Sequence, residues 1–424
     1  MNMDSLSIKK RFHSDAPLPT PFIPDEIVAE ILCLLSVKTI LQLRCVSKAW
    51  RTLISGPTFV QKHFKKSSQN PHLLFTPSKP SDPMGRVKSV PMIRLLETDP
   101  WIIVSNVNFH GWMDNCQVVG SCNGLLCLFF HYRYQNYWFC LWNPATRTLS
   151  EKLGTFQDYV FDTVYETCRF TFGCDISSGN YKVGTLSRVE VREENTFSVR
   201  NEFRVLSLCD NSWRSFQYCT SIPVCSIYHQ TKRINNGVHL NGTVNWLALP
   251  NHIQSCYKYD WKSIANAQQF VIVSLDLSSE TCSQFLLPPG FDEVPCFQPA
   301  LNVLMDYLCF SHDFKRIQFV IWQMKEFGVQ GSWTMLFKIN YFDIQIHNLH
   351  HNIDIISPIK FGTPLFPLYL SKNGDTLILA NYEEDQAVIY NQREKTVKRI
   401  RIADKLCFFS IMDYVESLVS TCLK

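Results

Sequence analysis

Apolar residues recur at helical spacing between residues 22 and 64, and from about residue 87 they give way to short runs typical of strands. In the first stretch the pattern breaks at Ser36 and near Ser47, and it stops at Gly56 and Pro57. Apolar positions three and four residues apart indicate helices that bury one face. The stretch therefore predicts three short packed helices, which a segment ending at Phe64 closes off.

The first predicted helix carries more apolar surface than so small a unit can bury. Two apolar stripes run along it, with Ile27, Ile31, Leu34 and Leu35 on one and Val28 and Leu32 on the other. A unit of roughly 40 residues is near the lower size limit for a self-sufficient core, so one stripe fills the core. The second stripe predicts a surface that docks a partner protein, although an apolar stripe also suits a plain structural cap.

The rest of the chain repeats one pattern of strands and turns. Runs rich in Val, Ile, Phe, Tyr and Trp are separated by Gly, Asn, Asp and Ser, and five copies begin near residues 123, 170, 237, 304 and 373, with a partial copy at 91–111. Repeats of about 50 residues with this pattern predict a kelch-like β-propeller of six blades, with a large twisted β-sandwich as the alternative. A C-terminal strand at 414–419 is expected to join the first blade and close the ring.

These patterns divide the chain into four parts and give an α+β multidomain fold. We expect a disordered lead-in at 1–20, a helical module at 21–66, a proline-bearing linker at 67–86 and an all-β domain at 87–424. Within the linker, Leu73-Leu74-Phe75 is expected to form a first edge strand.

Composition narrows the classes of function. The 424 residues are 46% hydrophobic and 18% charged, and their formal net charge of +4 gives no argument for nucleic acid or a membrane as partner. No apolar run is long enough to span a membrane, and the first residues lack the apolar core of a signal peptide. The 17 cysteines are scattered through apolar runs, which indicates buried thiols in a reducing compartment. We therefore expect a cytoplasmic or nuclear protein.

The motifs that could carry catalysis or a metal have simpler explanations. Residues 120–124 have the outline of a nucleophile elbow, but a strand follows instead of a helix, so a tight turn is expected. His347, His350 and His351 lack partners at metal-ligand spacing and predict a solvated loop. No phosphate-binding or dinucleotide-binding glycine pattern is present. The sequence predicts no cofactor, no metal and no catalytic residues.

The helical stretch resembles an F-box along its whole length. The matching residues are Ile23-Pro24, Glu30-Ile31-Leu32, Leu35, Val37-Lys38, Arg44-Cys45-Val46-Ser47-Lys48, Trp50, Leu53-Ile54-Ser55, Pro57 and Phe59. The stretch departs from the pattern at Ile23, where Leu is usual, at Ser36, where a second Pro is usual, and at Gln42, where Arg is frequent. The resemblance implies docking to a Skp-type adaptor and, through it, to a cullin-RING ubiquitin ligase.

The β-rich part resembles the F-box-associated domain of a very large plant family. The shared phrases are Gly120-Ser121-Cys122-Asn123-Gly124-Leu125, Leu141-Trp142-Asn143-Pro144-Ala145-Thr146-Arg147, Ser212-Trp213-Arg214, Asn241-Gly242-Thr243-Val244-Asn245-Trp246, Ser332-Trp333 and Tyr414-Val415-Glu416-Ser417-Leu418. Gly173-Cys174-Asp175 stands where Gly-Tyr-Asp is usual. These phrases consist of strand and turn residues, so we expect them to specify the fold and not a ligand site.

Together the two resemblances imply a non-catalytic substrate-recognition subunit of a Skp-cullin-F-box ubiquitin ligase. The expected adaptor contacts are Ile23, Pro24, Ile27, Ile31, Leu32, Leu35, Leu41, Leu43 and Trp50. An unidentified target protein is expected on loops of the β domain at 132–137, 188–199 and 252–267, with Tyr132, Tyr134 and Tyr137 as candidate anchors. The alternatives are a scaffold that works without the ligase and a glycan-binding propeller.

Overall fold

The computed structural model describes residues 23–77, 87–96, 105–107, 116–132, 136–157, 168–193, 196–217, 224–226, 237–250, 261–344, 365–381, 386–401 and 408–422. The chain divides into two compact units, which comprise residues 1–63 and 64–424. No helix among the described residues is long and apolar enough to cross a membrane.

The first unit is helical, as the spacing of apolar residues predicts. It contains α1 (Asp25–Leu32), α2 (Val37–Leu43), α3 (Lys48–Ser55) and the start of α4 (Pro57–Ser67). The expectation of three helices is wrong by one, because residues 57–67 form a helix of their own. Proline is well tolerated at the first position of a helix, so Gly56 and Pro57 mark a new helix as well as the end of the previous one.

Serine side chains begin two of these helices. The Ser36 hydroxyl accepts a hydrogen bond from the backbone N–H of Thr39 at 3.3 Å, and the Ser47 hydroxyl accepts one from Trp50 at 3.1 Å. Each bond satisfies a backbone donor that the first turn of a helix leaves unpaired. Ser36, which departs from the F-box pattern, therefore acts as the N-cap of α2.

Helix α4 completes the bundle by packing back on the segment around α1. Buried His63 donates a hydrogen bond from Nε2 to the Leu35 carbonyl oxygen at 3.0 Å, and Lys62 forms an ion pair with Glu30 at 2.5 Å. The bundle interior consists of Leu32, Cys33, Val37, Ile40, Ile54 and Phe59. So small a core agrees with the size limit that the sequence implied.

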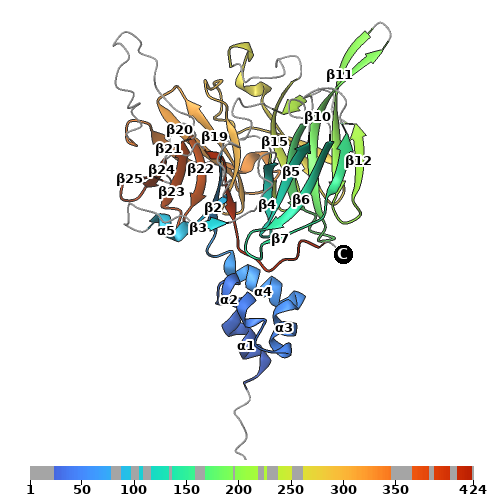
Figure 1. The fold of residues 1–424 in the computed structure, drawn as a ribbon. Coiled ribbons are helices and arrows are strands. Elements are labelled where there is room, and N and C mark those ends of the chain that lie inside the picture. The colour runs from blue at the N-terminus through green and yellow to red at the C-terminus, as the bar shows by residue number, and fades with distance from the viewer. Residues whose placement is uncertain are drawn as a thin grey trace, which may run out of the picture. The chain divides into compact units, whose positions relative to one another are not determined.

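The described strands of the second unit form six antiparallel sheets (Figure 1). From the inner to the outer strand, three of them comprise β26 (Phe408–Tyr414), β1 (His72–Pro77), β2 (Val87–Pro91) and β3 (Ser105–Val107); β4 (Cys116–Cys122), β5 (Leu125–Tyr132), β6 (Asn136–Asn143), with β7 (Thr148–Leu149) and β8 (Leu153–Gln157) both on β6; and β9 (Cys168–Cys174), β10 (Tyr181–Glu193), β11 (Thr196–Ser207) and β12 (Ser212–Gln217). Helix α5 (Met92–Leu96) follows β2.

The other three sheets follow the same plan. They comprise β13 (Val224–Ser226) and β14 (Val238–Leu240), both paired with β15 (Thr243–Pro250), then β16 (Val271–Asp276) and β17 (Cys282–Leu286); β18 (Ala300–Leu304), β19 (Tyr307–Phe314), β20 (Gln318–Met324) and β21 (Trp333–Asn340); and β22 (Leu365–Leu370), β23 (Thr376–Asn381), β24 (Gln386–Asn391) and β25 (Thr396–Arg401). Short 3-10 helices occur at Trp261–Ser263, Ala267–Gln269 and Gln330–Ser332.

The inner strands close into a ring. Strand β4 lies against β26 and β9, β14 lies against β9 and β18, and β22 lies against β18 and β26. A closed ring of six sheets is a six-bladed β-propeller, which confirms the blade number and excludes the β-sandwich alternative. The kelch-like detail stays a prediction.

The hydrophobic core is divided among the interfaces between neighbouring blades. Six clusters of buried side chains each combine residues from two sheets that are adjacent in the ring. One such cluster joins Phe129 and Phe139 of the second sheet to Phe172 and Val183 of the third. Because each blade covers the face of the next, all six blades depend on closure of the ring.

The closing blade combines both ends of the β domain. The C-terminal strand β26 pairs with β1, and β1 also pairs with β2. Two expectations are therefore wrong: residues 73–75 form a strand with neighbours on both sides and not an edge strand, and the closing strand comprises residues 408–414 and not 414–419. Residues 415–422, the described part of the chain beyond Tyr414, form no strand.

This last segment is fixed by two of the phrases noted in the sequence. The buried Asn143 amide donates hydrogen bonds to the carbonyl oxygens of Ser417 at 3.0 Å and Val419 at 2.8 Å, and its oxygen accepts from Ala145 N–H at 3.0 Å. The Asn123–Gly124 turn of the β4–β5 hairpin has positive φ at both residues, and a Cβ on Gly124 would lie 2.3 Å from the Ser417 hydroxyl. The tight turn expected at residues 120–124 is confirmed.

A buried ionic group connects the third and fourth sheets. Asp175, directly after β9, lies 3.6 Å from the Lys182 ammonium of β10, and Lys182 lies 3.0 Å from Glu280, after β16. Burial would raise the pKa of Asp175, but hydrogen bonds from Ser278, Ser178 and Ser177 outweigh burial and hold the pKa well below its usual value. Cys174, which stands where the family usually has Tyr, therefore does not prevent Asp175 from holding the two sheets together.

Candidate docking face on the helical module

One face of the helical module exposes large apolar side chains. Ile23, Ile27 and Ile31 follow one another at four-residue spacing along and just before α1, and 57%, 51% and 55% of their surfaces are exposed. Residues four apart lie on the same face of a helix. Leu34 continues the apolar surface in the turn after α1 and is 73% exposed. We call Ile23, Ile27, Ile31 and Leu34 the isoleucine face.

Helix α1 exposes this face because its other side fills the bundle interior. Leu32 is 2% exposed and belongs to that interior, while Val28 and Ala29 are half-buried. Burial of a large aliphatic side chain contributes roughly 1.5 to 3 kcal/mol, so three exposed isoleucines retain several kcal/mol for a partner. The isoleucine face therefore suits a protein interface.

The structure divides the nine expected adaptor contacts into three groups. Ile23, Pro24, Ile27 and Ile31 are exposed, and Leu35, Leu41, Leu43 and Trp50 are half-buried. Leu32 is buried, so its expected contact does not agree with this structure and it is excluded from the docking face. The expected contacts omitted Leu34 and the 63% exposed Val46, although Leu34 lay on the same apolar stripe as Ile31 and Val46 belonged to the F-box match.

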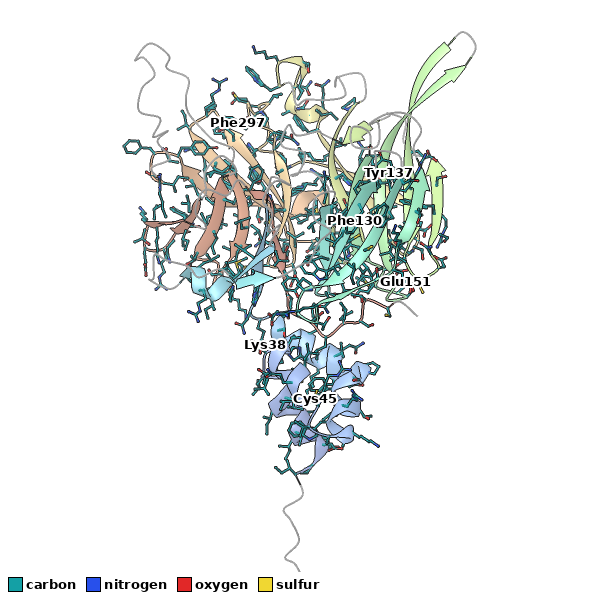
Figure 2. The ribbon with its side chains drawn as sticks, viewed as in Figure 1. Lys38, Cys45, Phe130, Tyr137, Glu151 and Phe297 are labelled. Carbon is teal, nitrogen blue, oxygen red and sulfur yellow. The ribbon has the colours of Figure 1, made fainter. Side chains whose placement is uncertain are left out.

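Of the three tyrosines expected to contact a target, the structure describes the side chain of Tyr137. Tyr137 of β6 is 0% exposed and stacks on Phe129 at 5.7 Å inside the core between two blades (Figure 2), so it is not a surface anchor. The sequence prediction placed Tyr137 in a loop, but Tyr137 is the second residue of β6. Side chains alternate between the two faces of a strand, and that of Tyr137 points to the buried face. Tyr134 and the side chain of Tyr132 lie outside the described residues.

All three expected recognition loops contain regular structure, and in the first of them β5 ends at Tyr132 and β6 begins at Asn136. Residues 188–193 and 196–199 belong to the long β10–β11 hairpin (Figure 1), in which Arg188 pairs with Asn201 and Glu193 with Thr196. A 3-10 helix forms at 261–263, within the expected loop at 252–267, of which residues 252–260 lie outside the described residues.

The described residues give no support to the catalytic and metal motifs considered in the sequence. Cys122 is buried at the end of β4, and burial raises the pKa of its thiol far above the usual value. A thiol in that state is a poor nucleophile at neutral pH. The cysteines whose side chains the structure describes are free thiols. His347, His350 and His351 lie outside the described residues, and within the described part no group of three or more His, Cys, Asp or Glu is placed to hold a metal ion.

Comparisons with known proteins match both units in sequence order. Residues 22–62 match the F-box domain, and residues 86–421 match the family described as F-box associated beta propeller domain. An F-box/kelch-repeat protein of Arabidopsis thaliana is 28% identical over 362 residues, which cover 83% of this chain and 88% of the relative. The Arabidopsis F-box protein CPR1 is 24% identical over 417 residues, which cover 94% and 89%.

Likeness to solved structures is low. TolB from Acinetobacter baumannii aligns with a TM-score of 0.42 and 9% identity over 84% of this chain and 72% of its own. This alignment is too weak to assign a family, so the assignment of both units rests on the sequence comparisons.

Proposed function

Because this chain belongs to the F-box associated beta propeller family and carries an F-box in front of the propeller, we propose that it is the substrate-recognition subunit of a Skp-cullin-F-box ubiquitin ligase. The F-box docks a Skp-type adaptor, and the propeller holds a target protein. The observation that carries the proposal is the isoleucine face, whose three isoleucines remain more than half exposed beside a complete bundle core.

The subunit acts by proximity and has no active site of its own in this proposal. A target held on the propeller is brought close to the ubiquitin-charged enzyme that the cullin recruits. Linking two binding modules in one complex raises the effective concentration of target lysines without new chemistry. Such a subunit works in the cytoplasm or the nucleus, where the ligase machinery is found.

Charge placed on the isoleucine face tests the docking step. In Ile31→Asp, adaptor binding would bury an unpaired carboxylate in place of an apolar side chain. We expect the dissociation constant for a purified Skp-type adaptor to rise about 100-fold, which corresponds to about 3 kcal/mol. Isothermal titration calorimetry measures this directly on the full chain.

The matched control is Gln61→Asp, which adds the same charge at an exposed position of α4. It should leave the affinity for the adaptor unchanged. Equal affinity of wild type and Ile31→Asp would refute docking through the isoleucine face.

The scaffold alternative predicts a different outcome in cells. A scaffold that works without the ligase would bind its target but would not co-purify with cullin. Co-purification of cullin with the wild-type chain, and its loss with Ile31→Asp, would support the ligase subunit over the scaffold. No described feature of the propeller favours the glycan-binding alternative.

A further inference from the structure

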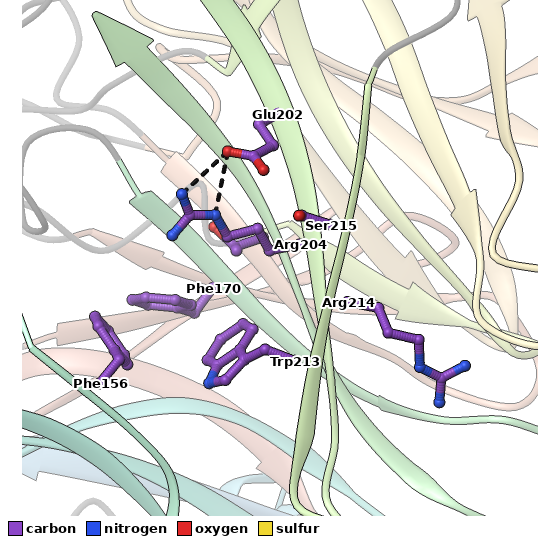
Figure 3. Close-up of a pocket in the computed structure, with 8 residues that line it drawn as sticks. Phe156, Phe170, Glu202, Arg204, Trp213, Arg214 and Ser215 are labelled. Atoms are coloured by element: carbon purple, nitrogen blue, oxygen red, sulfur yellow. Dashed lines mark hydrogen bonds and ion pairs between the residues drawn. The ribbon is translucent and has the colours of Figure 1, made fainter.

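A cavity of about 250 Å³ opens between the second and third sheets of the propeller (Figure 3). Phe156 of β8 lies on one side, and a row of residues directly opposite one another crosses the other sheet. In this row Phe170 of β9 faces Thr185 of β10, Thr185 faces Arg204 of β11, and Arg204 faces Ser215 of β12. The cavity therefore has its walls on two blades and extends from an inner strand to an outer strand.

The inner wall of the cavity is aromatic and fixed in place. The ring of Phe156 lies 5.7 Å from that of Trp213, nearly perpendicular to it, and 6.4 Å from that of Phe170. The indole N–H of Trp213 donates a hydrogen bond to the Gly154 carbonyl oxygen at 3.1 Å. Phe170 packs further inward on Phe129 at 4.9 Å, so the wall continues into the core cluster. Rings held in this way form an apolar surface before any ligand arrives.

The outer side of the cavity carries a guanidinium group held by a carboxylate. Nε and Nη2 of Arg204 both donate to one oxygen of Glu202, at 3.3 and 3.0 Å. Figure 3 shows the third guanidinium nitrogen of Arg204 on the side of Phe170. Arg214 points to the other side of β12, where it pairs with Glu280 at 3.1 Å, so it adds backbone and not charge to the cavity.

These features define the chemistry of an occupant. An apolar wall of three rings favours an aromatic group, which packs on ring edges and faces. The remaining N–H groups of Arg204 favour an oxygen acceptor on that group, whereas a lysine side chain would have to desolvate its ammonium group beside three rings and an Arg204–Glu202 pair of no net charge. The volume lies just below the range of about 300 to 1,000 Å³ for whole small-molecule pockets, so it suits a single large side chain.

We propose that this cavity, which we call the Trp213 pocket, binds one tyrosine side chain of the target polypeptide. The tyrosine ring packs on Phe156, Phe170 and Trp213, and its phenol oxygen accepts a hydrogen bond from Arg204. This inference rests on the proposed function for the presence of a target, but the pocket can be tested with a small probe. Buried aromatic anchors of this kind supply most of the energy of many protein interfaces.

The first experiment titrates the full chain with 4-methylphenol, the side-chain analogue of tyrosine, and follows binding by NMR. We expect saturable binding at one site. Toluene, which lacks the oxygen, should bind about tenfold more weakly, because a hydrogen bond to a charged donor contributes about this factor or more. Butylamine, an analogue of lysine, should bind more weakly than toluene. Absence of saturable binding by 4-methylphenol, or tighter binding of butylamine, would overturn the proposal.

Two variants place the probe in this pocket. Arg204→Met keeps an unbranched side chain and removes the donor, so it should weaken 4-methylphenol about tenfold and leave toluene unchanged. Ser215→Trp fills the outer end of the pocket and should abolish binding of both probes. Its matched control is Ser283→Trp, which changes another exposed serine on an outer strand, β17, and should bind both probes as wild type does.

The same variants separate this proposal from the proposed function. Ser215→Trp should bind the Skp-type adaptor with wild-type affinity, because the isoleucine face is intact. If wild type does not bind 4-methylphenol but binds the adaptor normally, only the proposed pocket is refuted. Normal binding of 4-methylphenol with no adaptor binding would defeat the ligase subunit alone. Equal binding of 4-methylphenol by Ser215→Trp and wild type would show that the probe binds elsewhere and would refute the pocket.

Discussion

The helical module and the propeller treat their apolar residues in opposite ways. The propeller places them between blades, in six clusters that each join two sheets of a closed ring. The module has one small interior, and Ile23, Ile27 and Ile31 stay outside it. A ring can bury both faces of every blade, whereas a bundle of four short helices buries one side of each helix. The apolar side chains exposed on the module thus follow from the small size of the unit.

The sharpest test of this contrast compares two isoleucines of the module. Ile40 is 0% exposed and Ile31 is 55% exposed. Ile40→Ala should lower the free energy of unfolding of the module by about 4 kcal/mol, because it leaves a cavity in a small core. Ile31→Ala should change it by less than about 0.5 kcal/mol. Chemical denaturation monitored by helical circular dichroism compares the two, and similar losses would remove the distinction between core and face.

A second test concerns the propeller, whose stability should depend on pH through a buried histidine. Burial lowers the pKa of His312 to about 4. The ring is neutral in the fold, since Nε2 accepts a hydrogen bond from the Trp322 indole at 3.3 Å and Nδ1 donates to the Asp313 carbonyl oxygen at 3.1 Å. The unfolded chain takes up a proton below about pH 6.5. The contribution is therefore fully present above pH 6.5 and is lost as the pH falls toward 4.

This loss should amount to about 3 kcal/mol, at 1.36 kcal/mol per pKa unit. Urea denaturation at several pH values measures it, and His312→Gln should flatten the profile between pH 6.5 and 4. The Asp292 carboxylate acts in the opposite direction on His312. Burial raises the pKa of Asp313, so the folded protein takes up a proton at this carboxylate before the unfolded chain does, which offsets part of the loss. A wild-type profile as flat as that of the variant would contradict the assignment.

Ring closure provides a third test, because the module has no counterpart to it. Asn143→Ala removes the amide that binds the carbonyl oxygens of Ser417 and Val419. Leaving these buried acceptors unpaired should lower the stability of the propeller by about 2 kcal/mol and leave adaptor binding unchanged. The control is Asn373→Ala, an exposed residue whose side chain bonds Ser371 and Asp375 within its own turn. Equal melting temperatures for the two variants would mean that the C-terminal segment does not hold the ring.

The smallest expected effect concerns the N-cap of α2. Ser36→Ala removes the hydroxyl that accepts from Thr39 N–H and should destabilise the module by about 1 kcal/mol. Adaptor affinity measured well below the melting temperature should stay the same, because Ser36 stands outside the isoleucine face. A drop in affinity without a drop in stability would show that this departure from the F-box pattern lies in the interface.

The sequence by itself determined the order of the units, the number of blades and a first helix with more apolar surface than its bundle can bury. Apolar spacing distinguishes helix from strand, and Asn-Gly pairs such as Asn123–Gly124 specify tight turns with positive φ. The helical spacing of Ile27, Ile31, Leu34 and Leu35 marked one face of the first helix. These features are local, so they can be read from neighbouring residues alone.

Only the tertiary structure decided which apolar residues are covered. The apolar periodicity predicted a docking contact for both Ile31 and Leu32. Ile31 is 55% exposed and Leu32 only 2%, because the other helices of the bundle occupy one side of α1. Tyr137 belongs to the core because the third sheet covers it, and the Trp213 pocket combines residues from β8 to β12. Burial depends on what another segment of the chain brings into contact, and that contact has no signature at the residue itself.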